Sequence, residues 1–298
     1  MKTQADADRW FAPALGALLF VAATALGAIL SASAGAVAGG VVGLFGAAGL
    51  HRALTRRFRR RRLLLATPFP PAWRKVLGEW CDHYDRLSPE LRRRFEDDVR
   101  IFLAEKRITG VAAEVTDELR LLVAASAVTL SLGWPDYDWD SLSEVLLYPQ
   151  DFDRDYGFDS QELSGQAHGW GTVILSIPSL RQSFEDPDDA YHVGFHEFAH
   201  LLDLEQTQFD GIPAGMTDAL AGEWVGLMRK EMVRLRRGKS VIDDYGAEEP
   251  AEFLAVAVEA FFESALALRE RHREVYALLR DYFGQDPAAW DDARGLRL

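Results

Sequence analysis

The sequence predicts an α+β fold in which helices dominate and strands are few. Two segments, 88–106 and 116–132, combine helix-start residues with helical or continuous apolar patterns. Two short apolar runs, 144–148 and 171–177, have the length and composition of strands, and the chain from Pro187 onward is again mainly helical in pattern. With 298 residues, 48% of them hydrophobic, the chain is long enough for one large domain with a real core, with or without an appendage.

The two best-defined helices are predicted from their first turns. The first begins at Ser88-Pro89-Glu90, where a capping serine precedes a proline and an acid. Its apolar residues recur at helical spacing up to about Lys106: Leu91, Phe95, Val99, Phe102 and Leu103. The second helix begins at Thr116, which two acids follow, and it ends before Gly133.

An apolar stretch near the N-terminus predicts membrane anchoring. Residues 12–50 contain no charged side chain, and a spanning helix needs about 20 apolar residues. Small and polar residues at its middle favour a helical hairpin at 12–30 and 34–50 over one generous span. The alternative is a cleaved signal peptide, whose apolar core is usually about 7–15 residues. The length of the stretch and the two acids before it favour the transmembrane hairpin.

A basic segment directly follows the apolar stretch. Its members are Arg52, Arg56, Arg57, Arg59, Arg60, Arg61 and Arg62. Positive charge beside a span marks the cytoplasmic side of a membrane, so we expect everything from about residue 52 onward to face the cytoplasm. The sequence thus predicts an anchor at 1–62 in the inner (cytoplasmic) membrane and a folded domain at 63–298.

The charge distribution and the cysteine count exclude some functions. Residues 1–62 hold nine basic and two acidic residues, whereas the whole chain has a formal net charge of −13. The domain at 63–298 is therefore strongly acidic, which argues against direct nucleic-acid binding. Cys81 is the single cysteine, so neither an intramolecular disulfide nor a cysteine-based zinc site can form.

The central chemical signal is His196-Glu197-Phe198-Ala199-His200. Residues four apart share one face of a helix, so both imidazoles can bind one zinc ion. Glu197 points off that face and is placed to act on water as a catalytic base rather than to bind the metal. The alternative is an amphipathic helix with incidental histidines. The flanking residues are apolar, and burying polar groups without partners costs several kcal/mol, which favours one zinc ion per chain.

The third metal ligand is open at the level of spacing alone. A histidine six residues after His200 is absent, because Gln206 stands there, and His272 lies in a charged stretch. A helix that begins at Pro250 offers Glu252 and Glu259 on or near its apolar face. A carboxylate from this second helix is the better candidate, and the spacing does not separate the two.

The motifs from about residue 70 to 285 resemble the peptidase family of the Mlc titration factor A, related to the lethal-factor type of gluzincin. The resemblance is carried by residues 196–203 and by Tyr245 followed by Pro250-Ala251-Glu252-Phe253-Leu254-Ala255-Val256. It implies a zincin-like domain, Glu252 as the third ligand and Tyr245 facing the site as an oxyanion donor. It also implies an aminopeptidase or endopeptidase and, in some members, binding of a glucose-responsive repressor. The N-terminal apolar hairpin departs from the shortest members.

Neighbouring residues complete the predicted site. Asp203 lies three residues after His200 and is expected to accept the second N–H of that histidine, the alternative being a surface acid at the helix end. His192 is expected to be buried near the site. A substrate backbone is expected to add to an edge strand near the metal, with Thr172, Val173, Ile174 and Leu175 as the candidates.

We expect the protein to hydrolyse peptide or protein substrates, with zinc activating water and Glu197 moving its proton. One alternative is a zinc-containing binding protein that sequesters a transcriptional repressor with little turnover; an intact Glu197 argues against it. Another alternative is a structural membrane protein with an incidental zinc helix.

Overall fold

A computed structural model describes residue 21, residues 45–46, 48–53, 55–135, 137–153, 157, 163–204, 209–238 and 240–293. The chain divides into two compact units, Met1–Pro68 and Phe69–Leu298. The predicted hairpin at 12–30 and 34–50 lies outside the described residues except at a few positions. Within the described part of the chain, no helix has both the length and the apolar character needed to cross a membrane.

In the first unit, the basic segment forms α3 (Arg56–Leu65), a helix without a single buried residue. Arginines occupy most of its positions, and they stay in solvent because a guanidinium is costly to bury without a partner.

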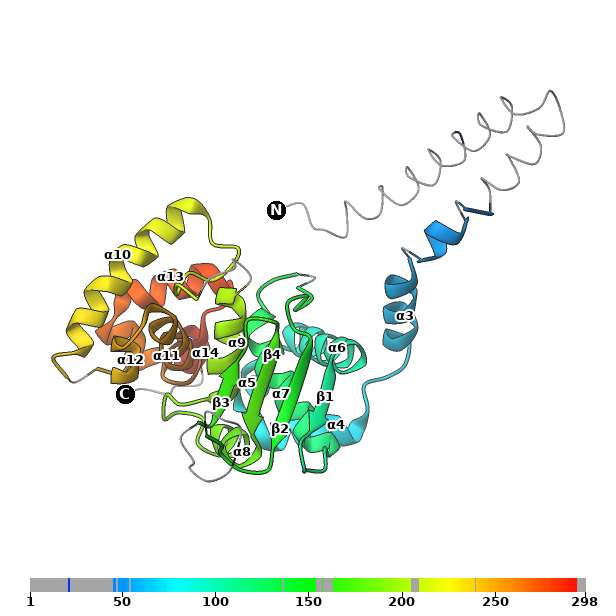
Figure 1. Ribbon diagram of the computed structural model, residues 1–298, viewed down its shortest axis with the longest axis horizontal. Coiled ribbons are helices and arrows are strands. Elements are labelled where there is room, and N and C mark those ends of the chain that lie inside the picture. Colours follow the sequence, from blue (N-terminus) through cyan, green and yellow to red (C-terminus); the bar gives the residue numbers. More distant parts are fainter. Residues whose placement is uncertain are drawn as a thin grey trace. The chain divides into compact units, whose positions relative to one another are not determined.

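The second unit contains a four-stranded mixed sheet and most of the helices (Figure 1). The strands are β1 (Arg107–Gly110), β2 (Glu144–Tyr148), β3 (Gly165–Ala167) and β4 (Thr172–Ser176). Their order in the sheet is β1-β2-β4-β3, with β1, β2 and β4 parallel and β3 antiparallel to β4. The helices before and between the strands are α4 (Pro71–Trp80), α5 (Asp82–Arg86), α6 (Pro89–Glu105) and α7 (Asp117–Ser131), and α8 (Ile177–Glu185) directly follows β4.

The remaining helices follow the sheet in sequence. They are α9 (Val193–Leu204), α10 (Asp218–Leu235), the short 3₁₀ helix η1 (Asp244–Ala247), α11 (Pro250–Glu263), α12 (Ala265–Arg271), α13 (Arg273–Phe283) and α14 (Pro287–Ala293). Figure 1 shows α9 between the sheet and the group formed by α10 to α14. Because α9 contacts β3, β4, α7 and α11, it is the central element of this unit.

Both predicted helix starts are confirmed. Ser88 and Thr116 accept hydrogen bonds from Leu91 N–H and Leu119 N–H, which caps α6 and α7. Nearly every residue of α7 is buried, which explains why its sequence is apolar all round rather than striped. The two predicted strands are confirmed as β2 and β4, and the predicted helix at Pro250 is confirmed as α11.

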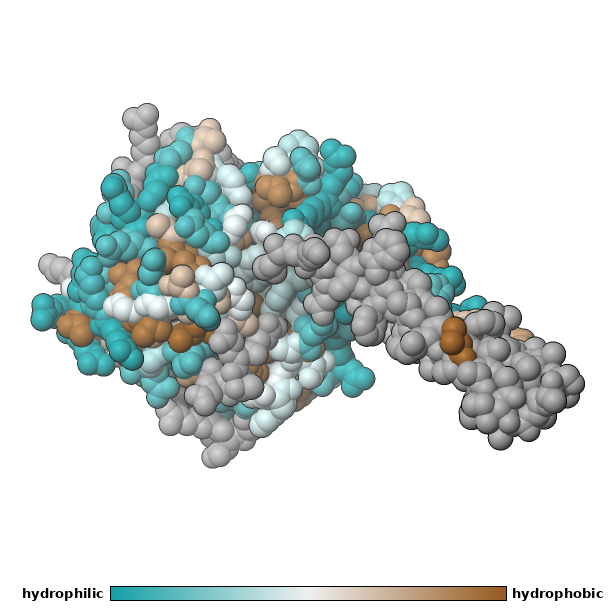
Figure 2. All heavy atoms as spheres, turned by 90° about the horizontal axis from the view of Figure 1, so that it is seen from above, coloured by the Kyte–Doolittle hydropathy of each residue, from teal (hydrophilic) through white to brown (hydrophobic). Residues whose placement is uncertain are grey.

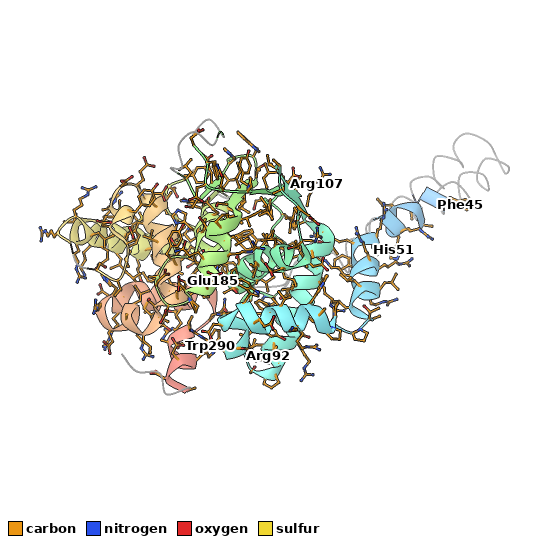
Figure 3. All side chains as sticks on the ribbon, turned by 90° about the horizontal axis from the view of Figure 1, so that it is seen from below. Phe45, His51, Arg92, Arg107, Glu185 and Trp290 are labelled. Atoms are coloured by element: carbon orange, nitrogen blue, oxygen red, sulfur yellow. The ribbon has the colours of Figure 1, made fainter. Side chains whose placement is uncertain are left out.

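The core joins the sheet to the helices on both sides of α9. Its largest fully buried side chains include Phe95, Phe198, Trp224 and Phe261. The C-terminal helix α14, which carries Trp290, lies beside the early helices (Figure 3). The centre of the Trp290 ring is 5.2 Å from that of the His83 ring. On the face of the molecule seen in Figure 2, polar residues predominate over scattered apolar ones.

The position of β4 corrects one prediction. Residues 172–176 were expected to form an edge strand, but β4 pairs with β2 on one side and with β3 on the other. Val173, Ile174 and Leu175 are buried in the core, and Thr172 opposes Glu144 in the ladder. A peptide cannot add to this strand because both of its hydrogen-bonding edges are occupied. Among the described strands, the one at the edge on this side of the sheet is β3.

Candidate metal centre

Helix α9 carries the histidine motif and is fixed at its start by His192. The Nδ1 atom of His192 accepts a hydrogen bond from Phe195 N–H at 3.1 Å, which satisfies a donor that the first turn leaves open. The imidazole stacks on the Phe195 ring at 3.7 Å. Burial lowers the pKa of His192 to about 3, so the ring stays neutral and can accept. His192 is therefore buried near the site, as predicted, and acts as a cap.

Three side-chain atoms converge between α9 and α11. His196 Nε2 lies 3.1 Å from His200 Nε2 and 3.1 Å from Glu252 Oε2, and His200 Nε2 lies 3.4 Å from the same carboxylate oxygen. Among the described residues, this is the group of histidine and acidic side chains with the spacing of a metal site. The structure thus brings both motif histidines together with Glu252.

The triangle fits a tetrahedral zinc ion. Zinc bonds of about 2.0–2.1 Å at tetrahedral angles place neighbouring ligand atoms about 3.3 Å apart, close to the separations found here. Glu259 accepts the proton on His196 Nδ1, so in the neutral ring His196 Nε2 carries a lone pair. That lone pair faces the Glu252 carboxylate, and two acceptors at 3.1 Å repel each other unless a cation lies between them.

The charges around the triangle also favour a cation. Burial disfavours a charged His196, but Glu259 and Glu252 outweigh that effect and raise its pKa well above the usual value. Burial likewise acts to raise the pKa of Glu252, yet hydrogen bonds from His196 and His200 lower it to about 2. In the absence of metal, protons therefore supply the positive charge that the three ligand atoms attract.

Glu259 lies behind His196 rather than in the triangle. Its Oε1 is 2.7 Å from His196 Nδ1, and its Oε2 accepts a hydrogen bond from His192 N–H at 2.5 Å. One buried carboxylate thus fixes the orientation of a motif histidine and holds the start of α9. Spacing alone left Glu252 and Glu259 equivalent; the structure separates their positions. Sequence reasoning had not foreseen this contact, although the seven-residue separation puts both glutamates on one helix face.

Glu197 is buried beside the triangle, with 4% of its surface exposed. Its Oε2 atom has no hydrogen-bond partner among the described residues, and burial raises the pKa of the carboxyl. Gly165 of β3 provides the room: a Cβ atom at this position would lie 2.5 Å from Glu197 Oε1. This glycine lets the edge strand approach the acid closely.

Tyr245 borders the same space from η1. Asp243 Oδ1 accepts a hydrogen bond from Tyr245 N–H at 2.8 Å and so fixes the start of this short helix. The phenol ring centre lies 6.3 Å from that of His196. Burial and the Glu252 carboxylate raise the pKa of Tyr245, so its hydroxyl keeps its proton at neutral pH.

Asp203 does not occupy the predicted place. Its two carboxylate oxygens accept hydrogen bonds from Gly211 N–H at 2.9 Å and Ile212 N–H at 3.1 Å. Within the described part of the chain, the buried His200 Nδ1 atom has no hydrogen-bond partner. The expectation that Asp203 orients His200 is therefore wrong. The side chain is instead used to hold the segment that follows α9, because two backbone donors there need an acceptor.

A helix that carries His-Glu-x-x-His, completed by a glutamate from a second helix, defines a metallopeptidase type of site. The glucose-regulated metallo-peptidase M90 family matches residues 55–284, and the chain belongs to this family. The chain is 32% identical over 244 residues to an uncharacterized protein of Synechocystis. This alignment covers 76% of the chain and 89% of the Synechocystis protein. The chain is 30% identical to the Mlc titration factor A of Edwardsiella ictaluri (71% and 83% covered) and 28% identical to that of Escherichia fergusonii (73% and 87%). The family resemblance seen in the motifs is confirmed.

Proposed function

We propose that this protein is a zinc-dependent peptidase with His196, His200 and Glu252 as the metal ligands. The observation that carries the proposal is the convergence of three ligand atoms beside the buried Glu197, whose Oε2 atom has no hydrogen-bond partner among the described residues. Membership of a metallopeptidase family supports it. We also infer a zincin-like arrangement, in which the edge strand β3 borders the metal site.

The described residues fit the steps of peptide hydrolysis. Zinc, when bound, supplies a Lewis acid that polarises the scissile carbonyl and lowers the pKa of water. Glu197 takes a proton from the attacking water and delivers it to the leaving amine, a role that suits a buried carboxyl whose pKa is raised. Tyr245 keeps its proton and donates a hydrogen bond to the oxygen that gains negative charge.

The free edge of β3 supports a binding mode for the substrate backbone. Ser164 C=O accepts a hydrogen bond from Ser176 N–H, and His168 N–H donates one to Thr172 C=O. Because backbone groups alternate along an antiparallel strand, the N–H and C=O groups of Gly165 and Ala167 point to the opposite side, away from β4. A peptide added here would run past Glu197, because Gly165 touches that side chain.

Zinc content and chelator sensitivity test the proposal. Purified full-length protein should hold about one zinc per chain and hydrolyse peptides, and a chelator should stop hydrolysis until zinc is restored. His196→Ala and His200→Ala should abolish zinc binding, and Glu252→Gln should weaken it. Zinc-free wild-type protein that hydrolyses peptides at the full rate would refute the metal mechanism.

A second candidate function comes from the relatives named Mlc titration factor A. We propose as the alternative that the protein binds a transcriptional repressor without much hydrolysis. We also propose that residues 1–62 anchor it in the inner membrane with the catalytic domain in the cytoplasm. The basic helix α3 supports this location, since arginines beside an apolar stretch favour the cytoplasmic side.

A further inference from the structure

A histidine and glutamate pair also lies outside the metal centre. His272 stands between α12 and α13, and its Nδ1 atom is 2.8 Å from Glu231 Oε2 of α10. Both side chains are buried, with 6% of His272 and 2% of Glu231 exposed. Arg234 donates to both oxygens of the same carboxylate. Because an ionised carboxylate only accepts hydrogen bonds, His272 Nδ1 donates to it, and Nε2 of the neutral ring is left as an acceptor.

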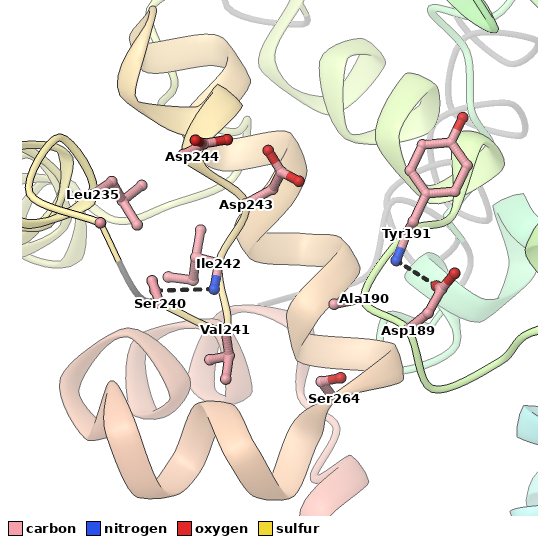
Figure 4. A pocket seen from close by; sticks show the side chains of 11 residues that line it. Asp189, Ala190, Tyr191, Leu235, Ser240, Val241, Ile242, Asp243, Asp244 and Ser264 are labelled. Carbon is pink, nitrogen blue, oxygen red and sulfur yellow. Dashed lines mark hydrogen bonds between the residues drawn. The ribbon is translucent and has the colours of Figure 1, made fainter.

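The other ring nitrogen of His272 bonds to a loop. Its Nε2 atom lies 2.8 Å from Ser240 Oγ, so the serine hydroxyl donates to the neutral ring. Ser240 Oγ in turn accepts a hydrogen bond from Ile242 N–H at 3.0 Å (Figure 4). Ile242 is itself buried. A continuous chain of hydrogen bonds therefore runs from Glu231 through His272 and Ser240 to the backbone of the loop, and each bond polarises the next.

The loop held by this chain leads directly to Tyr245. Asp243 follows Ile242, and its Oδ1 atom accepts a hydrogen bond from Tyr245 N–H at the start of η1. Beyond Tyr245, η1 approaches α11 so closely that a Cβ atom at Gly246 would lie 2.5 Å from Val256 Cγ2. Tyr245 is 43% exposed, so the packing of its own ring does little to fix it. Its position therefore depends on these anchors of the backbone on either side.

A Glu-His-Ser chain is also the arrangement that activates a serine nucleophile. In this chain the serine oxygen is already engaged by its own loop, because Ser240 Oγ accepts from Ile242 N–H two residues further on. That bond is typical of a serine that closes a turn. The hydrogen bonds of Ser240 therefore favour a loop anchor over a nucleophile.

We propose that Ser240, held by His272 and Glu231, is a positioning residue for the reaction, because it fixes the segment that carries Tyr245. The inference rests on the proposed function in that Tyr245 is taken as the donor to the oxygen that gains negative charge. Ser240 and His272 act only through that tyrosine. A donor of this kind must be in place before the reaction to stabilise the developing charge, and a displacement of about 1 Å costs roughly 10²-fold in rate.

Kinetics test the coupling to Tyr245. In full-length, zinc-loaded protein, Ser240→Ala should lower the kcat of peptide hydrolysis about 10- to 100-fold, with KM within about 2-fold and zinc content unchanged. In a Tyr245→Phe background, where the donor is already lost, Ser240→Ala should cost about 2-fold or less. A change that only weakened the fold would lower kcat equally in both backgrounds. An equal loss in the two backgrounds therefore overturns the proposal, as does full activity of Ser240→Ala.

His272→Leu tests the next link, since Glu231 keeps Arg234 as a partner in this variant. His272→Leu should lower kcat as much as Ser240→Ala does, and the double variant should lose about 2-fold or less beyond either single change. A loss in the double variant equal to the product of the two single losses removes His272 from the chain and overturns the proposal. If His272→Leu does not fold, the comparison of Ser240→Ala in the two backgrounds decides.

Amide hydrogen exchange measures the anchor without hydrolysis. Mass spectrometry of the full-length protein should show that residues 241–246 exchange about 5-fold faster or more in Ser240→Ala, because the loop loses the hydrogen bonds of its anchor. Ser88→Ala is the matched control, since Ser88 also accepts from a backbone N–H but caps α6, and it should change neither this exchange nor kcat. Unchanged exchange in Ser240→Ala overturns the anchor. If exchange rises as expected but wild-type protein hydrolyses nothing, the anchor stands and the peptidase proposal fails.

Discussion

Glu252 and Glu259 lie seven residues apart on α11, and both face the histidines of α9. Glu252 approaches His196 at Nε2, within the triangle of ligand atoms, whereas Glu259 approaches it at Nδ1, behind the ring. The sequence could predict the helix and the shared face, because those follow from local spacing. It could not predict which glutamate meets which nitrogen, because that depends on how two helices far apart in the sequence are packed.

The contact between Glu259 and His196 Nδ1 leads us to predict an effect on zinc affinity. Glu259→Gln should weaken zinc binding about 10- to 100-fold, since a glutamine cannot accept from both His196 Nδ1 and His192 N–H. Competition with a chelator of known affinity measures the change. Glu263→Gln is the matched control, because Glu263 is also a buried carboxyl of α11 but burial raises its pKa to about 10, so it is already neutral. An equal loss of zinc affinity in both variants would mean that Glu259 affects zinc binding only by stabilising the fold.

A second residue-scale prediction concerns acid stability. His83 is buried between Phe262 and Trp290, and burial lowers its pKa to about 3. The unfolded chain binds a proton at His83 below about pH 6.5 while the folded chain does not, so stability is complete above that pH and is lost as the pH falls. The loss at pH 5 is about 1–2 kcal/mol from this residue.

Chemical unfolding in the presence of a chelator, at pH 7.5 and pH 5, checks this contribution. His83→Phe removes the titrating group, so its unfolding free energy should fall about 1–2 kcal/mol less between the two pH values than that of wild type. Identical pH dependence in both proteins would show that folding does not keep His83 neutral.

At the scale of elements, the helices and strands that the sequence predicted correctly are those whose own residues carry a pattern. The helices with capped starts and the two apolar strands were predicted with nearly the correct ends, since Ser88, Thr116 and the runs at 144–148 and 171–177 each carry their own pattern. The three residues of β3, Gly-Gln-Ala, carry no strand pattern, and the strand order β1-β2-β4-β3 is set by packing. That is why β4 was wrongly expected at the edge.

The close approach of Gly165 in β3 to Glu197 leads us to predict an effect on the rate of hydrolysis. Gly165→Ala places a methyl group against Glu197, so the acid must shift; a shift of about 1 Å at a catalytic group costs roughly 10²-fold in rate. The loss should fall mainly on kcat, with zinc content unchanged. Gly169→Ala is the control from the same hairpin, because a Cβ there meets only Leu204 Cδ1 at 4.0 Å. Full activity of Gly165→Ala would show that β3 does not define the position of Glu197.

At the scale of the whole molecule, the chain joins a basic N-terminal helix to an acidic folded unit. The formal net charge of −13 coexists with an arginine-rich α3, and the stretch before α3 is uncharged from residue 12 to 50. The proposed anchor makes a topological prediction: reporters fused at residue 5 and at residue 298 should both lie in the cytoplasm. An external N-terminus with an internal C-terminus would show one span in place of a hairpin.

The central claim, that Glu197 serves a zinc centre as a base, is tested most directly by Glu197→Gln. The substitution keeps the size of the side chain, leaves His196, His200 and Glu252 in place as the ligands, and removes the ability of residue 197 to take a proton. Zinc content should match wild type, while hydrolysis of a peptide library should fall by at least about 10²-fold. If Glu197→Gln and wild type bind zinc equally and hydrolyse the library at the same rate, the account of this site as a peptidase centre is contradicted.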